Sequence, residues 1–265
     1  MKTTTYPFLE EAWTSNPFED DAARKNSSYS AAADGGLVRL LEASPASSFA
    51  TVAHDAFREF VLSDAFPCLM GRSALNRTTY RFGAYDRLDD ADITHGLARD
   101  LFGFVSERRA FGKAFDTFVA VFREPRLVDE ASFEQRLWSQ LQRLHDLDAR
   151  FHPWDERVAS DPDDPAFSFS FAKTAFFVVG MHPNASRSSR RFAWPALVFN
   201  AHEQFETLRA EGMLPDITER IRVREVQLDG SINANLAEYG EASESRQYSG
   251  RRVEDGWACP FKAHN

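Results

Sequence analysis

Short apolar segments that alternate with amphipathic helical segments constrain the fold of this 265-residue chain more than any other feature. Residues 78–85 alternate apolar and polar side chains, and residues 115–123 are mostly β-branched or aromatic, as strands are. The interleaved order predicts an α+β domain whose mixed or antiparallel sheet has about four to five strands and flanking helices. The expected strands are 78–85, 115–123, 167–171, 175–180 and 195–200, and the expected helices are 47–61, 92–107, 133–148, 201–212 and 216–228. We expect the strand at 175–180 to be buried on both faces, because it is continuously apolar.

The segment Phe133–Asp148 is the clearest helix of the sequence. Ser132 can cap its first turn, and Gln135 stands three residues later, as a capping box requires. Apolar side chains recur every four residues from Phe133, and His145 falls in the same register. We therefore expect the imidazole of His145 to face the interior of the protein.

The domain organisation follows from length and from local composition. Residues 14–30 are dominated by Ser, Ala, Asp and Asn, so residues 1–46 are expected to form a partly ordered N-terminal extension. Residues 47–265 would then form a single α+β domain, because a chain of this length lies at the upper edge of what one core organises.

Charge and targeting signals limit the partners of the chain. The formal net charge of −9 argues against a nucleic-acid partner, since such proteins usually present a basic face. No stretch approaches the roughly 18–20 apolar residues of a membrane helix, so we expect no membrane partner. Residues 1–8 lack the long apolar core of a secretory signal. The expected location is cytoplasmic, where Cys68 and Cys259 would be reduced thiols.

Two histidines on predicted helices are candidates for chemistry. An inward-facing imidazole such as that of His145 can ligate iron or another metal. A histidine near a helix C-terminus also hydrogen-bonds the last carbonyls, and the residues alone favour this structural interpretation. His202 opens a helix in the segment NAHEQF, where a histidine is commonplace, and a structural role is favoured there too.

A basic segment, His182–Phe192, directly follows an apolar strand, where loops of functional sites often lie. Arg187, Arg190 and Arg191 could clamp carboxylates or phosphates with their forked donors. A solvated basic turn is an equally good interpretation. His182 itself could be a metal ligand, a group of a distal pocket or a plain loop residue.

The two cysteines neighbour proline and phenylalanine in mirror order, as FPC at 66–68 and CPF at 259–261. A Cys-Pro pair can present a thiolate to haem iron, and cysteine is one of the known haem ligands. The alternative is two small buried hydrophobic residues at turns of the chain.

Several common catalytic motifs are absent from the sequence. It contains no GxxxxGK[ST] loop and no GxGxxG after a strand, so nucleotide-binding loops are disfavoured. It also contains no GxSxG, no HExxH and no Cys/His cluster with zinc-finger spacing. The residues themselves therefore lead to an α+β domain with a pocket that bears imidazole and arginine.

The order of five short segments resembles the YqcI/YcgG family, namely FPC at 66–68, LHDLD at 144–148, DPDDP at 161–165, HPNASRSSRRF at 182–192 and DGWACPF at 255–261. Each segment is weak alone, but their order is specific, and together they cover most of the chain. The segment LVFNAHEQF at 197–205, which follows the basic segment, is similar to one branch of the family.

This resemblance implies a haem-dependent N-oxygenase of natural-product biosynthesis, a monooxygenase that hydroxylates a guanidine nitrogen of L-arginine or a related guanidino compound. The implied cofactor is haem b, with its iron, and the implied partners are O2 and an electron donor or reductase. The 24 phenylalanines would help to exclude water from the haem pocket. A homodimer is one assembly that the sequence leaves open.

The resemblance also implies roles for the candidate residues. Haem b would lie between the helix of His145 and the loop of His182, with His145 as the proximal ligand of the metal. His182 and Cys68 would be the catalytic groups and the next ligand candidates. The other cofactor-binding residues would be Arg187, Arg190 and Arg191, which match propionates or a substrate carboxylate, and Cys259. The substrate guanidinium would meet a carboxylate, with Asp146, Glu203, Glu254 and Asp255 as candidates.

A haem-binding sensor or carrier without catalysis is the alternative function. Turnover of arginine with a reductant and O2 would separate it from the enzyme. An interaction domain without haem is a third interpretation, and it predicts a colourless protein even when haem is supplied.

Overall fold

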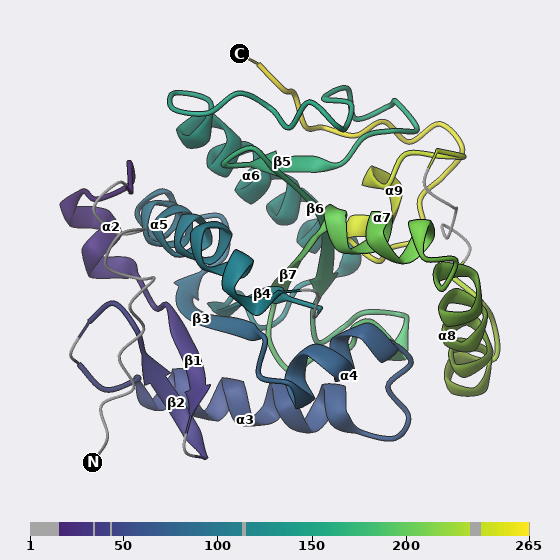
Figure 1. The fold of residues 1–265 in the computed structure, drawn as a ribbon, viewed down its shortest axis with the longest axis horizontal. Coiled ribbons are helices and arrows are strands. Elements are labelled where there is room, and N and C mark those ends of the chain that lie inside the picture. Colours follow the sequence, from purple (N-terminus) through teal and green to yellow (C-terminus); the bar gives the residue numbers. More distant parts are fainter. Residues whose placement is uncertain (1–15, 34, 43, 113–114, 234–239, 265) are drawn as a thin grey trace.

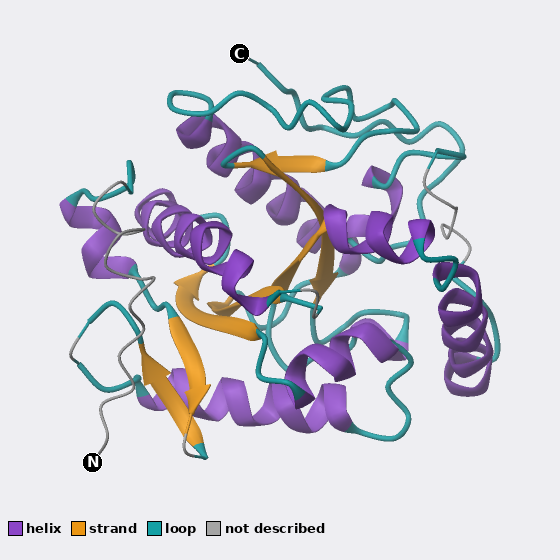
Figure 2. Ribbon diagram, in the orientation of Figure 1, coloured by secondary structure: helices purple, strands orange, loops and turns teal. Residues whose placement is uncertain are grey.

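A seven-stranded sheet forms the centre of the protein in a computed structural model, which describes residues 16–33, 35–42, 44–112, 115–233 and 240–264. The strand order is β2-β1-β3-β4-β7-β6-β5; β3 and β4 are parallel, and the other neighbouring strands are antiparallel. The sheet is therefore mixed and the fold is α+β, as predicted (Figures 1 and 2). The strands are β1 (Ser30–Ala33), β2 (Gly36–Arg39), β3 (Tyr80–Arg87), β4 (Thr117–Glu124), β5 (Phe169–Phe171), β6 (Thr174–Met181) and β7 (Ala196–Ala201).

Helices cover both faces of this sheet (Figure 1). Alternate residues of β4 serve the two faces: Phe118 belongs to the core cluster under α5 and α6, whereas Val119 belongs to the cluster under α3. The α-helices are α2 (Asp21–Asn26), α3 (Ser48–Leu62), α4 (Leu69–Asn76), α5 (Ala91–Glu107), α6 (Glu130–Asp148), α7 (His202–Ala210), α8 (Leu214–Asp229) and α9 (Ser245–Tyr248). Two short 3-10 helices, η1 (Arg108–Phe111) and η2 (Ser188–Arg190), lie in connections. No helix in these described ranges is long and apolar enough to cross a membrane.

The sheet has seven strands rather than the four to five predicted, because the segment before residue 47 contributes β1 and β2. This segment forms a hairpin that joins the sheet where Ser30 pairs with Phe82 of β3. Its strands consist mainly of alanine, glycine and serine, which lack the β-branched and aromatic side chains that mark a strand in sequence. Gly35 lies in the turn with φ of 79°, a value that glycine adopts without strain.

Two local predictions need correction. Helix α6 begins at Glu130 rather than Phe133, and its N-cap is Asp129, whose Oδ1 accepts a hydrogen bond from the Ser132 backbone N–H (2.7 Å). Asp and Ser are comparable N-cap residues, so the sequence allowed the helix to begin after either Asp129 or Ser132, which lie within one helical turn of each other. Strand β6 is not buried on both faces, because Phe177 and Val179 are only half-buried and line a cavity. The inward direction of His145 is confirmed, since only 4% of this residue is exposed.

Replacing Gly96 with alanine is expected to lower the free energy of unfolding by about 1–3 kcal/mol. A Cβ at Gly96 of α5 would overlap the backbone carbonyl of Asn26 at the end of α2, and backbone cannot yield as a side chain can. The helix propensity of alanine would favour the variant by about 1 kcal/mol, so a net loss of stability shows that the steric term dominates. Denaturant unfolding measures the change. Gly36→Ala is the control, because no heavy atom lies within 4 Å of a Cβ there, and an equal loss in both variants would contradict the prediction.

Candidate active site

A cavity of about 280 Å³, here called the β6/β7 cavity, lies on the sheet face that carries α3. Phe177 and Val179 of β6 face it together with Val198 and Asn200 of β7, because the antiparallel register pairs Val179 with Val198 and Phe177 with Asn200. Helices complete the wall with further apolar side chains, among them Phe57, Val61, Leu75, Phe205 and Ile221. A mostly apolar wall with a few polar groups is typical of a small-molecule site.

Three of the sequence motifs meet in this cavity although they lie far apart along the chain. The FPC segment contributes Phe66–Cys68 from the turn before α4. The basic segment contributes Ser189 and Arg190 of η2, and the segment LVFNAHEQF contributes residues from both β7 and α7, including His202. The cavity is therefore where a thiol, an arginine and a histidine from three separate motifs come together.

Cys68 places its thiol in the cavity wall at the N-terminus of α4. The backbone N–H of Gly71 donates a hydrogen bond to Sγ (3.4 Å), so the side chain caps the helix. Burial nevertheless raises the pKa of the Cys68 thiol, and this effect outweighs the N–H groups that favour the thiolate. Without a bound metal, Cys68 is therefore a neutral thiol.

His202 is the imidazole of this cavity, although a structural role was the favoured interpretation of this residue from the sequence. It is the first residue of α7, directly after β7, and only 5% of it is exposed. Nε2 lies 3.1 Å from Oε1 of Glu206, one helical turn later, and Nδ1 lies 3.6 Å from Oε1 of Glu244. A carboxylate beside a ring nitrogen orients an imidazole, and both ring nitrogens of His202 face a carboxylate.

Arg190, which is half-buried, supplies a positive charge to the cavity. Its Nη1 donates to the carbonyls of Gly180 (3.0 Å) and Tyr248 (3.3 Å), and Nη2 donates to that of Gln247 (3.3 Å). Burial lowers the pKa of Arg190 to about 10, with the charge of Glu225 acting in the opposite direction. At neutral pH the side chain stays cationic, and within the described residues these hydrogen bonds go to neutral carbonyls, so its charge can attract an anionic ligand.

The other two arginines of the basic segment do not line the cavity. Arg187 pairs with Asp229 at the end of α8 (Nε to Oδ2, 3.3 Å) and bonds Ser231, so it ties α8 to the loop. Arg191 is exposed and donates to the carbonyls of Ala185 and Ser186 within its own loop. Of the three predicted anion-binding arginines, the structure thus brings only Arg190 to this cavity.

His145 lies in a different place, at the C-terminal end of α6. Its ring packs against Trp154 and Phe261 (5.4 Å between centroids in each case), and Nε2 accepts a hydrogen bond from the backbone N–H of His264 (2.9 Å). It lines a second cavity of about 370 Å³ that shares no residue with the first. Burial lowers the pKa of His145, so the ring is neutral near pH 7. Its role as an iron ligand stays a prediction, and that prediction concerns this second cavity.

The C-terminal CPF segment packs beside His145 rather than beside Cys68. Phe261 and Trp257 contact Trp138 of α6 with ring centroids 6.2 and 6.4 Å apart. Cys259 belongs to the same packing, and burial raises the pKa of its thiol to about 12. The mirror-related FPC and CPF motifs therefore serve two separate regions, and Cys259 does not line the β6/β7 cavity.

His182 is almost fully buried and stacks on Phe133 of α6, with ring centroids 4.5 Å apart. It does not line the β6/β7 cavity, and Nδ1 has no hydrogen-bond partner among the described residues. Phe133 and His145 are separated by about 18 Å along the helix at ~1.5 Å per residue, so the structure does not bring His182 and His145 together.

Protonation of His182 is expected to make the protein less stable in acid. Burial lowers the pKa of His182, although Glu130 and Asp129 act in the opposite direction. The unfolded state then binds the proton more tightly than the folded state does. The contribution of neutral His182 to the free energy of unfolding is therefore fully present above the unfolded pKa of about 6.5, and it is lost as pH falls through the folded pKa. The free energy of unfolding, measured by denaturant from about pH 7 to about pH 5, should decline less steeply in His182→Phe, which keeps the ring stack. An unchanged slope would contradict this assignment.

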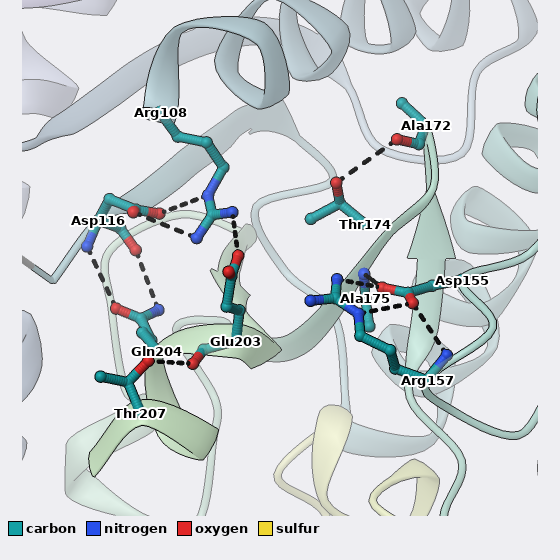
Figure 3. Close-up of polar contacts among 10 residues, drawn as sticks. All are labelled: Arg108, Asp116, Asp155, Arg157, Ala172, Thr174, Ala175, Glu203, Gln204 and Thr207. Carbon is teal, nitrogen blue, oxygen red and sulfur yellow. Dashed lines mark hydrogen bonds and ion pairs between the residues drawn. The ribbon is translucent and has the colours of Figure 1, made fainter. Parts of the chain in front are cut away.

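The carboxylates expected to meet a guanidinium are engaged elsewhere or exposed. Glu203 pairs with Arg108 (3.1 Å), which also holds Asp116, as Figure 3 shows. Asp146 pairs with His264, Glu254 pairs with Arg251, and Asp255 is exposed. The carboxylates that do line the β6/β7 cavity are Glu225 of α8 and Glu244. Sequence reasoning missed both, because α8 and the segment before α9 carry none of the recognised motifs.

Comparison with protein families gives one match. The model of the YqcI/YcgG family matches residues 57–262, which is well over half of the chain. Neither the comparison with curated proteins nor that with solved structures found a match. The matched range includes every residue of the β6/β7 cavity named above.

Proposed function

Because the chain belongs to the YqcI/YcgG family, we propose that it is a haem-dependent N-oxygenase that hydroxylates a guanidine nitrogen of L-arginine or a related guanidino compound. The observation that supports this most is the convergence of the FPC, HPNASRSSRRF and LVFNAHEQF segments on one apolar cavity. That cavity holds an imidazole, a thiol, three arginines and two carboxylates, groups of the types that could contact haem and a guanidino amino acid.

The donor groups of the β6/β7 cavity fit haem b by type. Histidine and cysteine are both known axial ligands, and His202 and Cys68 lie in the same wall. Arg190 offers a partly buried positive charge for a propionate or for a substrate carboxylate. The cavity volume of about 280 Å³ lies below the ~300–1,000 Å³ typical of ligand sites, so binding haem b together with a substrate would require its walls to move apart. Helix α8 has no fully buried residue, so it is the wall proposed to move.

We propose that His202, rather than Cys68, would be the residue that holds the haem iron. Glu206 holds one ring nitrogen of His202, the arrangement that orients metal-binding imidazoles. Cys68 is a helix cap whose thiol is kept protonated by burial, and a ligand must be deprotonated. When bound, haem would supply the activation of O2, using electrons from an external donor.

The residues of the chain would place and shield the substrate. Phe177, Phe205 and Ile221 would help to exclude water from the cavity, which would strengthen charged contacts within it. A carboxylate of the wall would hold and orient the guanidinium. In the overall reaction, one oxygen atom of O2 would convert the N–H of the guanidine to N–OH, and the other would be released as water with two electrons from the donor and two protons. A cytoplasmic reductase is the class of partner that would deliver these electrons.

Product analysis tests the proposed reaction. The purified protein, reconstituted with haem and supplied with O2 and a chemical reductant, should convert L-arginine to a product one oxygen atom heavier, as measured by mass spectrometry. L-citrulline, whose ureido group is neutral, is the matched control substrate. Stoichiometric haem without any product from guanidino compounds would favour the sensor or carrier and would overturn the enzyme.

A further inference from the structure

Helix α8 presents one face to the β6/β7 cavity. Its lining residues recur at intervals of three or four, as one helix face requires, and they are Leu214, Thr218, Ile221, Arg222 and Glu225. The helix is tied to the FPC turn by Arg224, whose Nη2 donates to the carbonyl of Phe66 (3.1 Å). These contacts bring a carboxylate from a polar helix into a mostly apolar wall.

Glu225 is the carboxylate of this face, and one of its two oxygens has no hydrogen-bond partner among the described residues. Only 14% of its side chain is exposed, and Oε2 is buried without a hydrogen-bond partner among the described residues. The cation paired with it, Arg187, lies 3.8 Å away, beyond hydrogen-bond distance, and makes its closer contacts to Asp229 and Ser231. A buried carboxylate oxygen that lacks a donor costs free energy, which a ligand that donates to it would recover.

Glu244, the second carboxylate of the cavity, is already engaged. Its Oε2 accepts hydrogen bonds from the hydroxyls of Ser168 (3.0 Å) and Tyr248 (3.5 Å), and Oε1 lies 3.6 Å from Nδ1 of His202. It therefore supports the imidazole and the fold around α9. Glu225 is the one of the two with a buried acceptor that lacks a hydrogen-bond partner among the described residues.

We propose that Glu225 binds the guanidinium group of the substrate through paired N–H···O hydrogen bonds and so selects guanidino compounds over neutral analogues. A carboxylate matches the forked donors of a guanidinium in a planar, two-bond contact. Arg190 lies in the same cavity and carries the opposite charge, so it would attract the carboxylate of an amino-acid substrate. This assignment rests on the proposed function and names its specificity residue.

Ligand binding to the haem-reconstituted, full-length protein tests this assignment. Calorimetry with L-arginine and with L-citrulline would be compared in wild type, Glu225→Gln and Glu219→Gln. Glu219 is an exposed glutamate on the same helix, so its variant makes the same change of charge away from the cavity. Glu225→Gln is expected to weaken arginine binding roughly 10- to 100-fold, the effect of losing a charged hydrogen-bond partner, and to remove the preference over citrulline. Glu219→Gln should bind as the wild type does.

A second variant guards against a folding defect. Glu225→Asp keeps the charge but withdraws the carboxylate, so it should lose arginine affinity to an intermediate degree while circular dichroism stays native. Wild-type preference for arginine that persists in Glu225→Gln would overturn the role of Glu225 and leave the proposed function intact. A wild-type protein that does not prefer arginine to citrulline would overturn both.

Discussion

Replacing His202 with alanine is expected to abolish haem retention and, with it, arginine N-oxygenation. The imidazole is buried at the start of α7, lies in the cavity where the family motifs meet, and is oriented by Glu206. Removing it would leave the cavity with the thiol of Cys68, whose pKa is raised by burial, and the thioethers of Met70 and Met181 as the remaining groups of haem-ligand type. The measurement is the Soret absorbance per protein after reconstitution and gel filtration.

Three further variants make this test decisive. Glu206→Gln should weaken haem binding by about 10- to 100-fold, because it removes only the orienting carboxylate. His145→Ala should keep its haem, because His145 lies in the other cavity and supports the C-terminal segment. Cys68→Ser should keep haem too. A His202→Ala protein with a full Soret band, combined with loss of haem in His145→Ala or Cys68→Ser, would move the ligand to that residue.

Glu107→Gln is expected to cost about 3–5 kcal/mol of stability, the largest effect that we expect from removing a single charge. Arg81 and Glu107 are each 4% exposed and joined by two hydrogen bonds, one of them 2.8 Å from Nε to Oε2. Tyr29 donates a third hydrogen bond to the same carboxylate (2.7 Å). The variant would leave the guanidinium of Arg81 buried without its counter-charge. Denaturant unfolding at neutral pH measures the loss.

A surface pair on the same strand provides the control. Asp86 of β3 pairs with Arg123 at 3.4 Å, and both side chains are more than half exposed. Asp86→Asn should change stability by less than about 1 kcal/mol, because water screens such pairs. The double variant Arg81→Met with Glu107→Met should recover much of the loss, since it removes both buried charges. Equal effects of Glu107→Gln and Asp86→Asn would show that the buried pair contributes no more than a surface pair.

The fold was predictable where hydrophobic periodicity is strong. Helix α5 and strand β4 begin and end within two residues of their predicted limits, because long amphipathic and β-branched segments leave few alternatives. The hairpin of β1 and β2 was not predictable, because its alanine- and glycine-rich strands gain their stability from pairing with β3 rather than from local preference.

The candidate site was predictable only in part, because a cavity is a property of tertiary structure. The FPC cysteine and Arg190 could be selected from motifs, and both line the β6/β7 cavity. The inward register of His145 was correct, but an inward direction does not tell which cavity a side chain reaches. Two signals pointed to His202: it follows a predicted strand directly, and a glutamate stands four residues later. No sequence feature near Glu225 indicated a site residue, because the sequence of α8 is typical of a polar surface helix.

The absorption spectrum of the purified protein, expressed with a haem precursor, tests the central claim most directly. The proposed function predicts a stoichiometric Soret band, and ligation by His202 predicts a ferrous-CO complex with the spectrum of an imidazole rather than a thiolate ligand, because a thiolate donates more electron density to the iron. Addition of L-arginine should perturb the band, since the substrate would lie in the same cavity. A protein that stays colourless after reconstitution would contradict the proposal of a haem-dependent oxygenase. The description of the fold and the family assignment would remain valid.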